Sequence, residues 1–299
     1  MGGYGQFKDF TNLEAALTVI WRREFVETSA VAPLFNIKDS ASASERTKGL
    51  GSMGMVPEKT GSELKRKELD PLDKNEYIHK EYSDYISIPL SFIEDQEYNL
   101  ISDMLTEYSG SYDRTWVYHM SSVFNNAFDS NFTGADGKAL CVASGRATGK
   151  LSLNNKGTTA LSATAVADTR KAMMKFKDAN GLYLMTKPDT LVVGTDLSDE
   201  GMVIVGSDRE SGTANNDMNT LRTLKLIVDP LIEGNNWFLA DSAKARRNLR
   251  WWWRVKPTGA GGFVVNPASD FNGEVQTRGR MRYSYGWDDA AWIYGHEVA

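Results

Sequence analysis

The residues of this chain that could do chemistry are three histidines and one cysteine among 299 residues. His79, His119 and His296 are far apart, and none has a second ligand at helical spacing, so no zinc site is indicated. Cys141 stands in the small, apolar stretch "KALCVAS", which favours a buried strand residue over a nucleophile. A single cysteine excludes a disulfide within the chain and favours a reducing compartment.

A phosphate-binding loop is suggested at first sight by "SGRATGKL", residues 144–151. Such a loop needs a glycine five residues before its Gly-Lys pair and a hydroxyl directly after the lysine. Ser144 and Leu151 occupy these two positions, so the hydroxyl that would bind magnesium is missing. The stretch therefore predicts a hairpin turn, between two strands over residues 138–153, rather than a nucleotide site.

Pairs of acidic residues are the remaining candidates for acid–base chemistry. Asp199-Glu200 and Asp288-Asp289 are adjacent in sequence, so the two side chains of each pair point in different directions. No stretch places a nucleophile beside a base, and we expect no catalytic residue, no metal site and no cofactor. An enzyme whose site lacks a linear motif remains an alternative.

Composition and charge narrow the function classes. Hydrophobic residues make up 41% and charged residues 24%, as in ordinary globular proteins. No apolar run approaches the roughly 20 residues that a membrane-spanning helix needs, so no membrane partner is expected. The net charge of −5 disfavours a dedicated DNA-binding protein. Residues 244–282 nevertheless carry nine Lys/Arg against two acids, which fits a solvated or interface surface or weak contact with a polyanion.

Three consecutive tryptophans stand between arginines in "LRWWWRV", residues 249–255. In a strand, Trp251 and Trp253 would point to one face and Trp252 to the other, so both faces need cover. Tryptophan and arginine are enriched in buried interface centres, whereas stacking on single-stranded nucleic acid is the alternative. With the basic stretch "LKRKEL", this gives the following candidates for a subunit interface: Trp251, Trp252, Trp253, Arg250, Arg254, Lys65, Arg66 and Lys67.

The elements that must position these residues are predicted from periodicity and turn signals. Apolar residues at spacings of three and four predict one long helix over about 93–128. The pattern continues across Gly110, where the helix can bend. Before it, residues 1–57 read as a short helix followed by a loose arm, and 63–89 as a two-stranded projection turning at "LDPLDKNE". After it, a helix capped by Ser162 and ending near Gly181 precedes several apolar strands and a short helix in "LSDEGMVIVGS". The fold class is α+β.

The order of these segments resembles a known family. "SFIEDQEYNLI", "NNAFDSNFTGADGKALCVAS", "NKGTTALSATAVADTRKAMMKFKDANGLYLMTKPDTLVVG", "TLKLIVDPLIEGNNWFLAD" and "YSYGWDDAAWIYG" are similar to the major head (capsid) proteins of tailed phages. The likeness is to the Mu-like head-subunit family, with the Hong Kong ninety-seven type capsid fold. It implies an N-terminal arm (1–57), an extended loop (58–90), a peripheral domain with the spine helix (91–159 and 266–299) and an axial domain (160–265).

The resemblance also implies a function and partners. It implies a structural subunit that assembles with itself into hexamers and pentamers of an icosahedral head. The head would enclose double-stranded DNA, which the subunits would contact weakly and non-specifically. Portal, scaffolding and decoration proteins are implied as further partners, with location in the virion after assembly in the host bacterial cytoplasm. A shell subunit of the encapsulin type, which packages a cellular enzyme, is the alternative of the same fold.

Overall fold

The computed structural model describes residues 10–24, 29–50, 56, 58, 71–144, 146, 151–178, 180–208, 218–266 and 273–298. The described residues combine six α-helices with sheets whose strands mostly pair antiparallel, which confirms the α+β class. The α-helices are α1 (Phe10–Glu24), α2 (Leu90–Glu94), α3 (Tyr98–Asn125), α4 (Ala163–Met174), α5 (Ser198–Gly206) and α6 (Ser242–Asn248). The strands are β1 (Asn36–Asp39), β2 (Ser44–Leu50), β3 (Pro71–Ile78), β4 (Lys80–Pro89), β5 (Leu151–Ser152), β6 (Lys156–Gly157), β7 (Lys177–Asp178), β8 (Thr190–Val193), β9 (Lys225–Val228), β10 (Trp237–Ala240), β11 (Leu249–Val255), β12 (Phe263–Asn266), β13 (Glu274–Trp287) and β14 (Ile293–His296).

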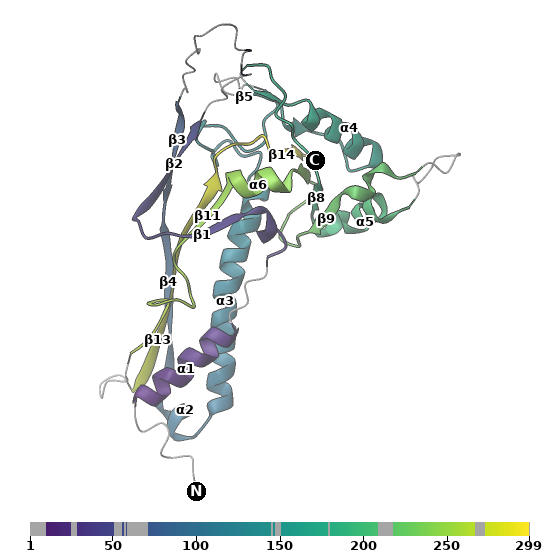
Figure 1. Ribbon diagram of the computed structural model, residues 1–299. Coiled ribbons are helices and arrows are strands. Elements are labelled where there is room, and N and C mark those ends of the chain that lie inside the picture. Colours follow the sequence, from purple (N-terminus) through teal and green to yellow (C-terminus); the bar gives the residue numbers. More distant parts are fainter. Residues whose placement is uncertain are drawn as a thin grey trace.

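The long helix α3 is the spine of the molecule and runs beside β4 and β13 (Figure 1). From Ile101 to Met120 its buried apolar side chains recur every three or four residues, so the predicted apolar stripe is confirmed. From Met120 to Phe124 every residue is buried. It continues through Gly110, as predicted, but begins later than residue 93. Gln96, with φ of 61°, breaks the helical path, and the preceding turn forms the separate helix α2.

Strand β13 is the centre of a five-stranded sheet. One of its edges pairs with β4 from Glu274 to Tyr283, and the other pairs with β12 and then with β11, which pairs in turn with β1. Helix α1 packs on α3, and Trp21 stacks on Phe263 of β12 at 4.7 Å between ring centroids. The short helix predicted in the N-terminal segment is thus α1, and it is folded onto its own subunit.

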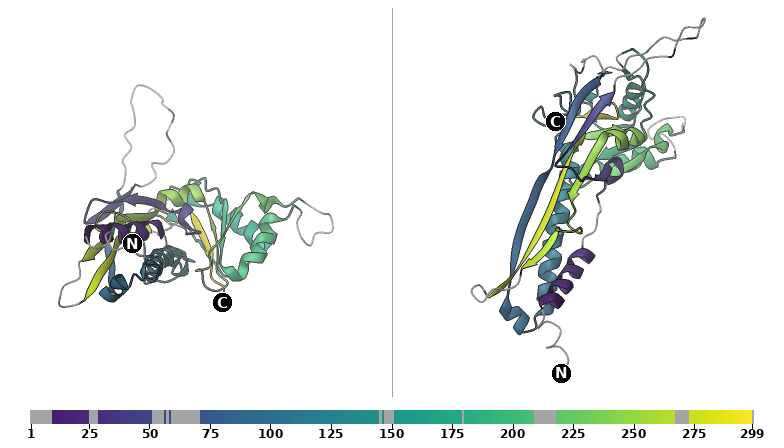
Figure 2. Two further views of the ribbon diagram at one scale, coloured as in Figure 1. Left: turned by 90° about the horizontal axis from the view of Figure 1, so that it is seen from below. Right: turned by 60° about the vertical axis from the view of Figure 1, so that its left-hand side comes forward.

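The predicted turn at "LDPLDKNE" is wrong, because its described residues, from Pro71 onward, begin strand β3. β3 pairs antiparallel with β2, whose residues we expected to belong to the loose arm, and this strand pair extends beyond one end of β4 (Figures 1 and 2). We call it the β2–β3 hairpin. The strand path continues through His79 directly into β4. Turn-forming residue types thus occur inside a strand because long-range pairing overrides local propensity.

Two tyrosines of the spine insert their hydroxyl groups into the ladder between β4 and β13. The Tyr108 hydroxyl accepts from the Gly279 N–H at 2.8 Å and donates to the Asp84 carbonyl at 2.8 Å. The Tyr112 hydroxyl accepts from the Asp84 N–H at 3.1 Å and donates to its carboxylate. A Cβ at Gly279 would stand 2.6 Å from the Tyr112 ring, so glycine makes this close approach possible. The helix is therefore hydrogen-bonded to both strands at one point.

A second sheet, of order β6-β14-β10-β8-β9, carries α4 and α5 (Figure 1). Its strands β8, β9, β10 and β14 and helix α5 lie where the sequence predicted strands and a short helix. The prediction that α4 is capped by Ser162 is confirmed, but the helix ends at Met174, and Gly181, with φ of 76°, instead belongs to the turn after β7. The segment before β8 forms only a bridge between Lys177 and Tyr183, where we predicted a strand.

The predicted strand over "KALCVAS" is absent, and the side chain of Asn155 explains why. Its amide group donates to the carbonyls of Leu140 (2.8 Å) and Ile293 (3.2 Å), and its oxygen accepts from the N–H of Val142 (3.0 Å). Its own carbonyl accepts from the N–H of Gly295. One fully buried amide thus satisfies the backbone of an irregular segment and ties it to β14.

His296 is held neutral between the second sheet and α4. Its ring stacks on Trp237 with centroids 4.0 Å apart, and its Nδ1 accepts from the Thr159 N–H at 3.2 Å. The proton is therefore on Nε2, which donates to the Thr169 hydroxyl at 2.8 Å. Burial lowers the pKa of His296 from 6.5 to about 4.

The lowered pKa of His296 predicts acid sensitivity. The unfolded chain binds the proton from pH 6.5 downward, whereas the folded chain binds it only near pH 4. The free energy of unfolding should therefore be constant above pH 6.5 and fall by about 3 kcal/mol toward pH 4. Denaturant unfolding of wild type and of His296→Phe, which can still stack on Trp237, measures this. Equal losses in both proteins between these pH values would contradict the prediction.

Candidate subunit interface

The strand that carries the three tryptophans is β11, and its bounds agree with the prediction. Trp251 and Trp253 point toward the spine, where both rings contact Trp116 at 6.2 Å between centroids. The Trp251 ring also stacks on Tyr283 of β13 at 4.6 Å. Trp251 is fully buried and Trp253 is 2% exposed, so these two rings belong to the core of the subunit itself.

Trp252 points to the opposite face of the sheet, as the strand periodicity predicted. Its ring is half-buried, and the Lys38 Nζ of the neighbouring strand β1 lies 5.8 Å from the ring centroid. Arg254 is exposed on the same face and donates to the Ser40 carbonyl at 3.4 Å. An interface role for Trp252 and Arg254 stays a prediction, while Trp251 and Trp253 have their cover within the subunit.

Arg250 contacts the chain's own Asp288, which fixes the root of the β2–β3 hairpin. The Asp288 carboxylate accepts from Arg250 Nε (2.8 Å), the Tyr77 hydroxyl (2.6 Å) and the Thr47 hydroxyl (2.5 Å). Burial and the nearby Asp288 carboxylate raise the pKa of Tyr77. This site was not predicted, because its members come from four distant segments and only the Asp-Asp pair is noticeable in the sequence. The bonds to Asp288 therefore fix the root of the hairpin.

Removal of the Asp288 carboxylate tests this anchor. We expect Asp288→Ala to leave the buried hydroxyl of Tyr77 and the Arg250 guanidinium without their acceptor, at a cost of about 1–3 kcal/mol. Amide hydrogen exchange should speed up in β2 and β3 and stay unchanged in α4. Glu76→Ala is the matched control, because its partner Arg46 is exposed and the pair adds little (44% and 71% side-chain exposure). Unchanged exchange in the hairpin would show that the anchor lies elsewhere.

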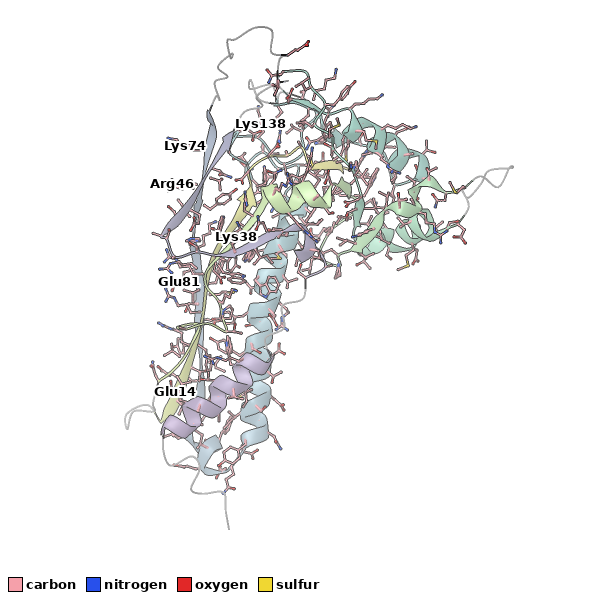
Figure 3. The ribbon with its side chains drawn as sticks, viewed as in Figure 1. Glu14, Lys38, Arg46, Lys74, Glu81 and Lys138 are labelled. Carbon is pink, nitrogen blue, oxygen red and sulfur yellow. The ribbon has the colours of Figure 1, made fainter. Side chains whose placement is uncertain are left out.

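Of the remaining candidates, Lys65, Arg66 and Lys67 lie outside the described residues. On the outer side of the hairpin and sheet, Figure 3 shows Lys74, Arg46, Lys38 and Glu81 along one flank of the molecule. This flank is charged and extends over both the hairpin and the central sheet. It is a surface over which a partner could lie.

The residues with which the chain could do chemistry are separated from one another, and all are buried except His119, which is half-buried. Burial lowers the pKa of His79, His119 and His296, and raises that of the Cys141 thiol to about 12. Within the described part of the chain, no group of three His, Cys, Asp or Glu side chains is placed to hold a metal ion. Among the same residues, no helix combines the length and apolar character needed to cross a membrane.

Comparison with known proteins agrees with a structural role. Residues 80–295 match the phage capsid protein family. The chain belongs to this family. The matched part of this capsid protein begins with β4 and includes the spine, the tryptophan strand and the strands of both large sheets except β1.

Solved structures share the fold of this capsid protein at low sequence identity. A chain from Microbacterium phage Oxtober96 is 9% identical with a TM-score of 0.53, and the match covers 92% of each chain. A chain from the capsid of an empty GTA particle is 13% identical (TM-score 0.53; 92% and 91% covered), and one from the capsid of cyanophage P-SCSP1u is 10% identical (0.54; 92% and 89%). No curated protein matches the sequence. The fold is the Hong Kong ninety-seven type expected from the resemblance, whereas membership of the Mu-like group stays a prediction.

Proposed function

We propose that this capsid protein is the major head subunit, which assembles with itself into hexamers and pentamers of an icosahedral shell around double-stranded DNA. The observation that supports the proposal is the family match over residues 80–295, which spans the whole spine and every strand of the central sheet except β1. The subunit is also elongated, and the β2–β3 hairpin is anchored at its root (Figure 2). Its role is structural, and we propose no catalytic step for it.

The proposed partners follow from the same role. Identical subunits are the first partner, and portal, scaffolding and decoration proteins are others. The net charge of −5 is consistent with weak, non-specific contact with packaged DNA. Assembly would take place in the cytoplasm of a bacterial host before the subunit becomes part of the virion.

The proposed division into domains can be compared with the sheets. We propose a peripheral domain around α3 and β13 and an axial domain around β8 and β10. β11 and β12, from the segment expected to be axial, lie in the sheet with β13, and β14, from the segment expected to be peripheral, lies in the other sheet. The chain thus crosses between the two parts more often than the sequence segments suggested.

Assembly of the purified protein tests the proposed function. Native mass spectrometry and negative-stain imaging should show capsomer rings or closed shells of megadalton mass. A monomer or dimer that persists in all buffers would contradict the proposal and favour an enzyme without a linear motif. Shells that form in the absence of phage components and retain one cellular enzyme would favour the encapsulin-type alternative.

Truncation of Trp252 tests the predicted interface on the tryptophan strand. Because the ring is half-buried on the face away from the spine, we expect Trp252→Ala to leave a folded, soluble subunit that assembles poorly. Sedimentation of assembled and free protein measures the effect, and circular dichroism reports the fold. A normal yield of shells would place the interface elsewhere.

A further inference from the structure

The face of the central sheet that turns away from the spine carries cations without acidic partners. Trp251 and Trp253 point toward α3, so Trp252 and its register partner Lys38 on β1 point to the opposite face. Tyr283 of β13 also points toward the spine, so Arg278 and Ser284 share the face of Lys38, because strand residues alternate. Arg254 lies at a β-bulge, and it bonds to the Ser40 carbonyl on this same face, where His79 joins the hydroxyls of Ser40 and Ser284. All three cations are exposed. We call these three residues the basic face.

Ion pairing within the subunit leaves the basic face charged. Its neighbour Arg280 is neutralised by Glu81, with two contacts of 2.9 and 2.8 Å. Lys256 is likewise paired with Asp39 at 3.0 Å. Among the described residues, no such acidic partner contacts the cations of the basic face. The excess of basic residues that the sequence shows over 244–282 is therefore only partly cancelled in the folded subunit.

Acidic residues cluster where α2 meets α3, at one end of the molecule. Residues 91–113 contain six acids and no Lys or Arg. Glu94, Asp95, Glu97 and Asp103 are exposed, and together we call them the acidic end. The further acid Glu107 is paired with Arg114 at 2.6 Å. Within the described chain no ion pair joins the acidic end to the basic face, so each is left for a contact outside the subunit.

We propose that the basic face of one subunit binds the acidic end of a second copy. The inference rests on the proposed self-assembly and names the surfaces that meet. Their charges are complementary, and because they are different surfaces of one chain, the contact is head-to-tail. Head-to-tail contacts between identical subunits form a ring where the rotation from one subunit to the next closes, whereas a contact of one surface with itself stops at a dimer. Complementary charge also sets which surfaces meet, because it suppresses wrong pairings.

Charge reversal on either surface, and on both together, tests the proposal. The variants are Lys38→Glu/Arg254→Glu/Arg278→Glu on the basic face, Glu94→Lys/Asp95→Lys/Glu97→Lys on the acidic end, and all six changes in one chain. Lys38→Arg/Arg254→Lys/Arg278→Lys keeps the charge and is the control. Sedimentation gives the assembled fraction at about 0.05 M and about 0.5 M salt, where screening differs several-fold. Circular dichroism melting checks the fold, and Arg254→Gln/Arg278→Gln replaces the reversed basic face if reversal disturbs it.

We expect charge reversal on one surface alone to lower the assembled fraction about ten-fold at low salt. The variant with all six changes should restore the assembled fraction to within about two-fold of wild type. The control and the wild type should assemble alike, and high salt should weaken both. Normal assembly of the reversed basic face would overturn the inference and leave the proposed function standing. If the single-surface variants fold but the variant with all six changes does not assemble, the pairing of the two surfaces would be overturned. It would also be overturned if the reversed basic face gave normal shells that no longer contain nucleic acid, because the basic face would then contact DNA. A wild type that never assembles would contradict the proposed function itself.

Discussion

Trp251→Ala should be among the most damaging single substitutions in this subunit, costing about 3–5 kcal/mol of unfolding free energy. The indole is fully buried and stacks on both Tyr283 and Tyr285, at 4.6 and 5.3 Å between centroids. Its N–H has no hydrogen-bond partner, so the loss is one of packing and of the cavity left behind. Urea unfolding of the unassembled subunit measures the change.

The neighbouring Trp252→Ala is the matched comparison for this result. It removes the same number of atoms from the same strand but from the half-buried face, so it should cost less than half as much stability. The two variants thus separate a folding defect from an assembly defect. Equal losses of stability would show that the outer face of β11 is as well packed as the inner one.

Asn155→Asp is the second substitution from which we expect a large effect, about 3–5 kcal/mol, although it changes the shape of the side chain very little. The carbonyls of Leu140 and Ile293 would lose their donor and face a carboxylate in a fully buried position. Burial would raise the pKa of the new carboxyl group, so the destabilisation should grow as the pH rises. Thermal unfolding at about pH 5 and about pH 8 measures the loss of stability and its dependence on pH.

Asn154→Asp is the control for this substitution. Asn154 is exposed, and its side-chain oxygen accepts from the Lys156 N–H at 3.2 Å, a bond that a carboxylate can also accept. The change should stay within about 0.5 kcal/mol. If the two variants were equally stable, the buried amide would not be what holds the irregular segment to β14.

The elements predicted correctly from the sequence are those whose signal is local. The spine repeats its apolar residues every three or four positions over 28 residues, so its existence was clear, and only its start was displaced by the break at Gln96. β11 alternates in burial along its length, as strand periodicity requires. Ser162 caps α4 through its own side chain, accepting from the Ala165 N–H, which is also a local contact.

The elements predicted wrongly depend on residues far apart in the chain. Asn75 favours turns, yet it is held in β3 by pairing with β2 and by a bond from its amide to the Trp287 carbonyl. The anchor on Asp288 joins segments more than 200 residues apart, and nothing in the spacing of its members indicates it. The bonds of Asn155 to the carbonyls of Leu140 and Ile293 likewise join segments that are distant in the sequence. The candidate interface was found only as a pattern of residue types, and the fold separates its core members from its surface members.

The two tyrosine hydroxyls between β4 and β13 have a mechanical consequence. A helix that only packs on a sheet can slide along it, because its side chains can move from one groove to the next. Here a shift of one helical turn would remove the hydroxyls from Asp84 and Gly279 and leave the opened ladder without partners. The spine, β4 and β13 should therefore move as one rigid body. Any change in the curvature of a shell must then come from bending beyond the ends of this rigid body.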